Sequence, residues 1–458
     1  MEKEFRQNKM GVMPEGKLLF TMSVPLCLSM LLQAFYNIVD SIFVSRLGED
    51  ALTAVSLAYP IQMLMIAVSV GTGVGMNSLI SRRLGERRIK EANLAANNGL
   101  GLLFVSSCVF MLIGIFFSGT FFRMFTDIPA IQQMGTEYLS ICCILCVGVF
   151  FQVGCERIMQ AQGQNVAAMI MQMIGAVINI VFDPILIFGL LGFPALGVAG
   201  AAWATVGGQI VSMICCLVVL ARGKFEVKPH LAGFRFDGQI VKEIYQVGLP
   251  SIIMQAIGTV MNLFMNALLI AYTTTAVAIF GVYFKIQSIV FMPVFGMNNA
   301  SMSIMAYNFG ARNKKRLLRT RRLAQIAALC LMSVGLLVFQ LFPAELLLLF
   351  DASADMLTIG VPAMRIISSC FLFAAIGITN SILFQAVGRG TYSMYISLIR
   401  QLFVLVPAAY LYSAIFGTLN AVWMCFPTAE IVALILSIVM VRVVRRDLID
   451  PLDLPLKD

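Results

Sequence analysis

The stretch RRLGERRIKEA, from Arg82 to Ala92, has a counterpart in YNFGARNKKRL, from Tyr307 to Leu317. Gly85 falls on Gly310, an offset of 225 residues, and the same offset aligns most of the two halves without a gap. Near the end, Trp203 meets Trp423 after a deletion of five residues. Each single match is weak, but the shared offset indicates an internal duplication. The other matched pairs include Pro25 with Pro250, Asn37 with Asn262, Gln62 with Gln287, Gly71 with Gly296, and Gly135 with Gly360.

The composition indicates the solvent in which the duplicated chain folds. Of the 458 residues, 60% are hydrophobic and only 12% are charged, and the mean hydropathy is +0.90. Soluble domains carry roughly a quarter charged residues. We therefore expect an all-α, multi-pass protein of the cell membrane with the lipid bilayer as its partner. The net charge of +9 lies in short clusters between apolar runs, so no nucleic-acid partner is expected.

Apolar runs long enough to cross a bilayer recur along the whole chain, since a spanning helix needs roughly 20 such residues. Lysine and arginine follow an alternating pattern, with 27 of the 32 in the N-terminus, the even-to-odd connections and the C-terminus. This bias predicts that both termini are cytoplasmic. The twelve predicted spans are 18–44, 52–80, 94–120, 131–155, 165–190, 197–221, 244–271, 276–306, 323–349, 356–384, 393–415 and 419–441.

Six spans in each half predict two parallel repeats, an arrangement typical of alternating-access transporters. We expect an N-lobe at 1–221, a cytoplasmic linker at 222–242, a C-lobe at 243–446 and a cytoplasmic tail at 447–458. The substrate cavity is expected between the lobes, and the chain is expected to be monomeric.

Two acids within spans are candidates for ion coupling, because an ionisable residue inside a membrane is functional by default. Asp40 lies in YNIVDSIFVSRLG, from Tyr36 to Gly48, and Asp183 follows Asn179 by one helical turn in NIVFDPILIFG. A helical rise of about 1.5 Å per residue places both carboxylates at similar depth, within reach of Thr205. The oxygens of the two carboxylates, the Asn179 amide and the Thr205 hydroxyl predict a binding site for H⁺ or Na⁺. No other metal and no cofactor is expected. The alternative is that both acids cap helix ends or face lipid headgroups.

Other polar and flexible residues are candidates for the cavity or for helix bending. Pro25 and Pro250 occupy equivalent positions and can each bend a helix, because proline removes a backbone hydrogen bond. Glu430 and Arg400 are expected to form a structural ion pair, and Glu156 and Arg157 a solvated boundary. The substrate-cavity candidates are Tyr36, Asn37, Gln255, Met261, Asn262, Met265, Lys285 and Met292.

The repeat, QAQGQ at residues 160–164 and the motifs around Asp40 and Asp183 together resemble the multidrug and toxic compound extrusion (MATE) family, in its DinF-like branch. The resemblance implies cation-driven antiport of varied, often cationic, lipophilic drugs. It implies that Asp40, Asn179 and Asp183 form the coupling site, with Thr205 as the nearest hydroxyl; the register against Ala201 and Ala202 stays open.

Two other functions are alternatives to drug antiport. One is a flippase of related two-lobed fold for a lipid-linked oligosaccharide or another lipid, for which Lys285, Arg365 and Arg400 are scattered candidates to hold a pyrophosphate. A membrane enzyme is the second alternative, but the chain has no HExxH, G-x-S-x-G or P-loop motif.

Overall fold

The computed structural model describes residues 8–230, 234–350 and 352–453. The chain divides into two compact units, here called the N-unit (Leu28–Ile252) and the C-unit (Met1–Cys27 with Ile253–Asp458). The boundaries lie within helices α2 (Glu15–Ser45) and α10 (Gly238–Ile270), each two residues after a proline. The lobe boundaries expected at residues 222–242 stay a prediction.

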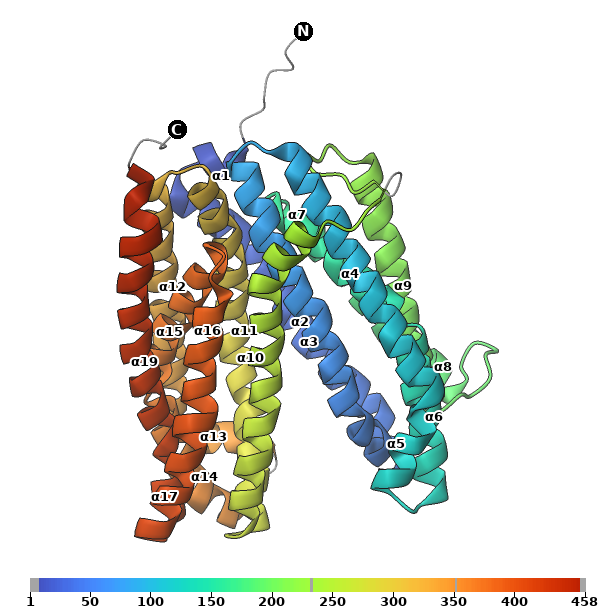
Figure 1. Ribbon diagram of the computed structural model, residues 1–458. Helices are drawn as coiled ribbons and strands as arrows, with labels where there is room; N and C mark the ends of the chain where they lie inside the picture. Colours follow the sequence, from blue (N-terminus) through green and yellow to red (C-terminus); the bar gives the residue numbers. More distant parts are fainter. Residues whose placement is uncertain (1–7, 231–233, 351, 454–458) are drawn as a thin grey trace. The chain divides into compact units, whose positions relative to one another are not determined.

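The N-unit consists of the second part of α2, the first part of α10 and the helices between them (Figure 1). Helix α6 is followed by α7 at a bend of 43°, so the predicted span 131–155 is a bent pair rather than one straight helix. The helices between α2 and α10 are α3 (Glu49–Gly85), α4 (Ile89–Phe116), α5 (Ser118–Phe125), α6 (Pro129–Ile144), α7 (Val147–Ala161), α8 (Asn165–Phe188) and α9 (Val198–Arg222).

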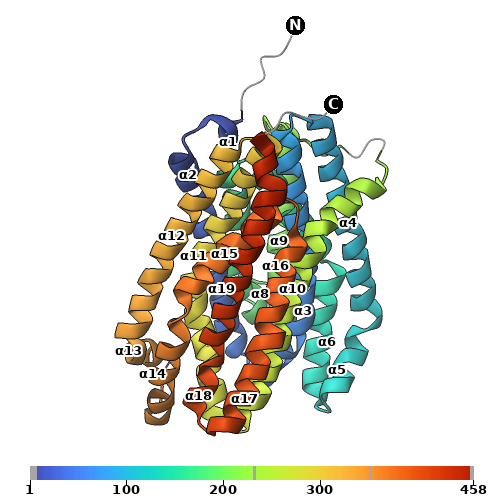
Figure 2. The same ribbon diagram turned by 60° about the vertical axis from the view of Figure 1, so that its left-hand side comes forward.

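The C-unit repeats this order, and the bounds of α11 and α12 fall 225 residues after those of α3 and α4 (Figure 2). The pair α14–α15 bends by 46°, as α6–α7 does. The described residues hold ten helices long and apolar enough to span a membrane, or twelve if each bent pair counts as one span. The elements are α1 (Lys9–Val12), α11 (Thr274–Gly310), α12 (Lys314–Leu341), α13 (Pro343–Leu348), α14 (Ala354–Ser368), α15 (Phe371–Ala386), α16 (Gly390–Leu398), the π-helix η1 (Ile399–Leu405), α17 (Val406–Phe416), α18 (Leu419–Trp423), α19 (Cys425–Val444), η2 (Arg445–Ile449) and η3 (Asp450–Asp453).

A matched glycine lies against the backbone just beyond each proline. In the N-unit, a Cβ on Gly71 would lie 2.8 Å from the backbone nitrogen of Ile252. In the C-unit, a Cβ on Gly296 would lie 2.7 Å from the backbone nitrogen of Cys27. Cβ atoms essentially never approach another heavy atom so closely, so both contacts require glycine. The duplication of Gly71 as Gly296 therefore has a packing reason.

Each unit has its own apolar core, and the two tryptophans of the chain differ in their surroundings. Trp423 is 0% exposed in the C-unit core, where its ring stacks on that of Phe280 at 6.1 Å. Trp203 is 46% exposed and lines an apolar groove between α8 and α9 of the N-unit.

The polar segment between α9 and α10 packs back onto the N-unit. Side chains of α4 and of the turn after α7 accept hydrogen bonds from its backbone. These bonds fix the described part of the segment on the surface of the N-unit. The bonds are Val227 N to Gln162 Oε1 (2.8 Å), Lys228 N to Asn93 Oδ1 (2.8 Å), His230 N to Asn97 Oδ1 (2.9 Å) and Asp237 N to Asn98 Oδ1 (2.9 Å).

Candidate functional site

The structure brings together the four residues that the sequence assigned to ion coupling, all within the N-unit. The carboxyl groups of Asp40, on α2, and Asp183, on α8, lie within hydrogen-bonding reach of each other. Asn179 Nδ2 donates to Thr205 Oγ1 at 3.1 Å and to Asp183 Oδ1 at 3.4 Å. Asp183 and Asn179 are buried. Three helices, α2, α8 and α9, therefore converge on one cluster of oxygens.

This cluster holds buried oxygens that have no hydrogen-bond donor among the described residues. They are Oδ1 of Asp40, Oδ1 of Asn179 and Oδ2 of Asp183. An unsatisfied buried acceptor is costly, so such atoms indicate a place for a bound proton, water or cation. A proton shared by the two carboxyl groups, or a monovalent cation between them, would also relieve their repulsion.

Close packing of α8 against α9 sets the position of Thr205. A Cβ on Gly208 would lie 2.6 Å from the carbonyl oxygen of Gly175, so the two backbones touch where neither residue has a side chain. Ala201 and Ala202 are fully buried in the neighbouring apolar cluster, whereas Thr205 faces Asn179. In this register, Thr205 is the α9 hydroxyl at the oxygen cluster.

A line of polar side chains continues along α2 from Asp40 through Tyr36 to Gln33 and Ser29, and the last two were not expected from the sequence. Tyr36 hydrogen-bonds to Gln33, Gln172 Nε2 donates to Gln33 Oε1 at 3.0 Å, and Ser29 pairs with Gln172. Positions 29, 33, 36 and 40 share one helical face, and this spacing is the signal that could have revealed the line from sequence.

The expectation of a solvated boundary at Glu156 and Arg157 is wrong. Each is only 8% exposed, on α7 of the N-unit. Gln152 Nε2 donates to Glu156 Oε1 at 3.0 Å, and Arg157 Nη1 donates to Gln160 Oε1 at 3.1 Å. The amide side chains one helical turn away take the place of water, which a reading of charge alone did not detect.

The cavity candidates occupy three different environments. Tyr36 lies beside the carboxyl pair, and Asn37 is exposed. In the C-unit, Met261 and Met265 are buried in the apolar core, and their place in a substrate cavity stays a prediction. The remaining candidates are less buried: Gln255 and Lys285 are exposed, Met292 is half-buried, and Asn262 is half-buried with its Oδ1 unpaired among the described residues.

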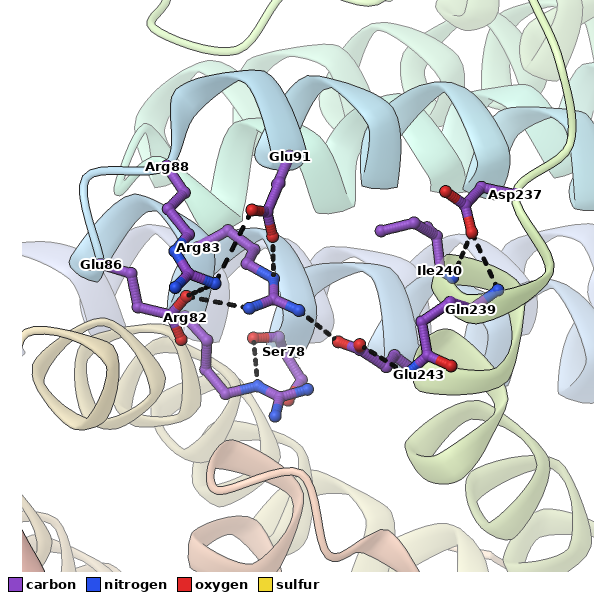
Figure 3. Close-up of polar contacts among 10 residues, drawn as sticks. All are labelled: Ser78, Arg82, Arg83, Glu86, Arg88, Glu91, Asp237, Gln239, Ile240 and Glu243. Atoms are coloured by element: carbon purple, nitrogen blue, oxygen red, sulfur yellow. Dashed lines mark hydrogen bonds and ion pairs between the residues drawn. The ribbon is translucent and has the colours of Figure 1, made fainter. Parts of the chain in front are cut away.

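A second polar cluster surrounds the basic stretch RRLGERRIKEA, residues 82–92, in the N-unit (Figure 3). Arg83 contacts Glu86 of the α3–α4 turn at 2.9 Å, Glu91 of α4 at 3.2 Å and Glu243 of α10 at 2.7 Å. Asp237 caps the start of α10 by accepting from the backbone of Gln239 at 2.9 Å. The basic connection is thus an ion-pair network that ties the first part of α10 to α3 and α4.

The MatE family model matches this chain twice, at residues 25–185 and 250–411, which cover both halves of the repeat. The chain belongs to the MatE family. Members of the family are membrane transporters rather than enzymes, and their ion-coupled transport needs no cofactor. The chain is accordingly a multi-pass protein of the cell membrane.

Individual MATE relatives match over nearly the whole chain. The multidrug export protein MepA of Staphylococcus haemolyticus is 24% identical over 433 residues, covering 94% of each chain. An FAD transporter of Shewanella oneidensis is 25% identical over 415 residues, covering 88% of this chain and 89% of the relative. The solved structure of a MOP superfamily transporter from Pyrococcus furiosus has a TM-score of 0.91 at 27% identity, covering 99% of this chain and all of that one. The predicted MATE-like helical fold is therefore confirmed.

Proposed function

We propose that this MATE transporter is an antiporter that exports lipophilic, often cationic, drug-like compounds in exchange for H⁺ or Na⁺. The proposal rests on the Asp40–Asp183 pair and its unpaired buried oxygens. MepA, a multidrug exporter by name, supports the substrate class. Ion binding between the two carboxyl groups would change the packing of α2 against α8, which gives the ion a mechanical connection to the substrate path.

Dye efflux from intact cells tests this proposal. Cells that produce the protein are loaded with a fluorescent lipophilic cation, and the pH and Na⁺ gradients are collapsed separately. We expect efflux to stop with one of the two gradients. Asp40→Asn and Asp183→Asn should each abolish efflux, whereas Asp127→Asn, in an exposed loop, should not. Full efflux by both site variants would contradict the coupling role.

A second candidate is export of a phosphate-bearing compound such as a flavin dinucleotide. The FAD transporter of Shewanella oneidensis, similar over 88% of this chain, favours it. The flippase alternative has less support, because one of its three candidate cations, Arg365, already uses its Nε to bond the backbone oxygen of Gln340. Flavin release into the medium, absent from cells carrying Asp40→Asn, would favour this candidate over drug export.

A further inference from the structure

The C-unit holds an ion pair deep within its spans. Arg400 Nη1 contacts Glu430 Oε1 at 2.6 Å, and the two side chains are 30% and 14% exposed. The helical stretch that carries Arg400 begins at Gly390, and the one that carries Glu430 begins at Leu419. A rise of about 1.5 Å per residue places both groups ~15 Å along their spans, near the middle of a hydrocarbon core about 30 Å thick.

The duplicated fold does not require charges at this place. The offset of 225 residues aligns Arg400 with Gly175, and the alignment of Trp423 with Trp203 sets Glu430 against Ile210. In the N-unit this helix crossing is made by the touching backbones of Gly175 and Gly208. Burying an ion pair has a desolvation cost that an apolar contact avoids. Because the N-unit makes the same helix crossing without charges, the fold does not need this ion pair in the C-unit.

The backbone around Arg400 is also unusual. Residues Ile399–Leu405 form a π-helix, a distortion that is frequently found at functional sites. Gln401, the next residue, is buried, donates to Ser397 Oγ at 2.8 Å and lies against Gly258 of α10. One turn before Gly258, α10 carries the exposed Gln255. Polar groups of η1 and α10 thus lie next to Arg400 in the sequence or against the residue that follows it.

The side chain of Arg400 is 30% exposed near the middle of the membrane, so its guanidinium must face either lipid or a water-filled path. Charged residues within spans almost always face the protein interior or a water-filled path, because contact with lipid is costly. Among the described contacts, Glu430 uses only one nitrogen of Arg400, which leaves Nη2 and Nε as donors. Two parallel N–H donors of a guanidinium match the two oxygens of a carboxylate or phosphate.

We propose that Arg400, held by Glu430, is a recognition site for the acidic group of an amphipathic substrate. A carboxylate or phosphate would bind the free edge of the guanidinium, and Glu430 would keep the side chain in place and balance its charge in the empty site. This rests on the proposed export function and adds a substrate class, compounds that bear an acidic group, which the carboxyl pair of the N-unit would repel.

Two dyes that differ in one ester test the proposal. Rhodamine 123 is a cationic methyl ester, and rhodamine 110 is the same molecule with a free carboxyl group. We expect Arg400→Gln to lower rhodamine 110 efflux, and its binding to purified protein in equilibrium dialysis, by about tenfold or more, the usual effect of losing a hydrogen bond to a charged group. Rhodamine 123 should change less than about twofold. The control Arg123→Gln, on the exposed surface of α5, should affect neither dye.

Equal loss of both dyes in Arg400→Gln, at unchanged protein amount and thermal stability, would overturn the proposal. The exchanged pair Arg400→Glu with Glu430→Arg gives an independent check, since it restores an ion pair but moves the guanidinium to α19. A purely structural pair would restore the efflux of both dyes, whereas a recognition site would keep rhodamine 123 efflux and still lack rhodamine 110 efflux. If the unaltered protein exports neither dye, the proposed function fails, and the dialysis measurement still tests the site.

Discussion

Replacing Thr205 with valine tests how the oxygen cluster of the N-unit is organised. The change removes one hydroxyl and preserves the shape of the side chain. Asn179 Nδ2 has two acceptors, Thr205 Oγ1 at 3.1 Å and Asp183 Oδ1 at 3.4 Å, and the longer contact is weak. Thr205→Val therefore leaves a buried amide without its better acceptor, which costs about 1–3 kcal/mol.

The cost should appear as weaker ion binding. Without Thr205 the amide can rotate, so Oδ1 of Asn179 is no longer held toward the carboxyl pair. A loss of about 1.4 kcal/mol is tenfold in affinity. We expect the coupling-ion concentration for half-maximal dye efflux to rise about tenfold, which for protons is a shift of about one pH unit toward acid. The maximal rate should change little.

The assay measures dye efflux as a function of external pH and of Na⁺ in cells or proteoliposomes. Thr205→Ser should restore the original dependence, because it returns the hydroxyl. Thr53→Val serves as the matched control, since the Thr53 hydroxyl bonds to its own helix at an exposed position. An unchanged ion dependence in folded Thr205→Val would show that Thr205 has no part in the site.

Three further outcomes follow from the packing and the charges. Gly208→Ala should lower the free energy of unfolding in detergent by about 1–3 kcal/mol, because its Cβ would lie 2.6 Å from the backbone oxygen of Gly175. The control Gly207→Ala, which has no heavy atom within 4 Å of the added Cβ, should be neutral or slightly stabilising. Equal effects of the two changes would contradict this packing. Arg83→Gln should destabilise the protein more than Glu243→Gln in thermal unfolding, because it removes ion pairs to three carboxylates and leaves Glu86 and Glu91 with only the longer contacts to Arg88; the reverse order would show that the network is not centred on Arg83. Pro25→Ala should reduce dye efflux more than it reduces protein amount on immunoblots, because it restores a backbone hydrogen bond inside α2 and so removes a place where this helix can bend; unchanged efflux would remove Pro25 from the mechanism.

The features predicted from sequence are those that depend on spacing along a single helix or on the offset of the repeat. Helical rise alone placed Asp40 and Asp183 at similar depth, and the structure brings their carboxyl groups together. The 225-residue offset between Gly71 and Gly296 marks a close backbone contact in each unit. Both features can be found from the sequence because their positions, a depth along a helix and an offset between repeats, are counted in residues.

Features that depend on neighbouring helices could not be reached in this way. Burial of Glu156 and Arg157 depends on amide partners and on packing around α7, which no hydropathy window contains. The bends at α6–α7 and α14–α15 occur at Leu145–Cys146 and Ser369–Cys370, where neither proline nor glycine marks a break. Packing against neighbouring helices determines these features. A straight helix and a bent pair have the same apolar sequence pattern, so hydropathy does not distinguish them.

The two tryptophans give each unit a different optical response. Trp423 is sealed in the C-unit core, so its emission should be blue-shifted and protected from acrylamide and from brominated lipid. Trp203, in its open groove on the N-unit, should be quenched readily by brominated lipid. Because the duplication left one indole in each unit and no other in the chain, fluorescence of the unlabelled protein can follow each unit separately during transport.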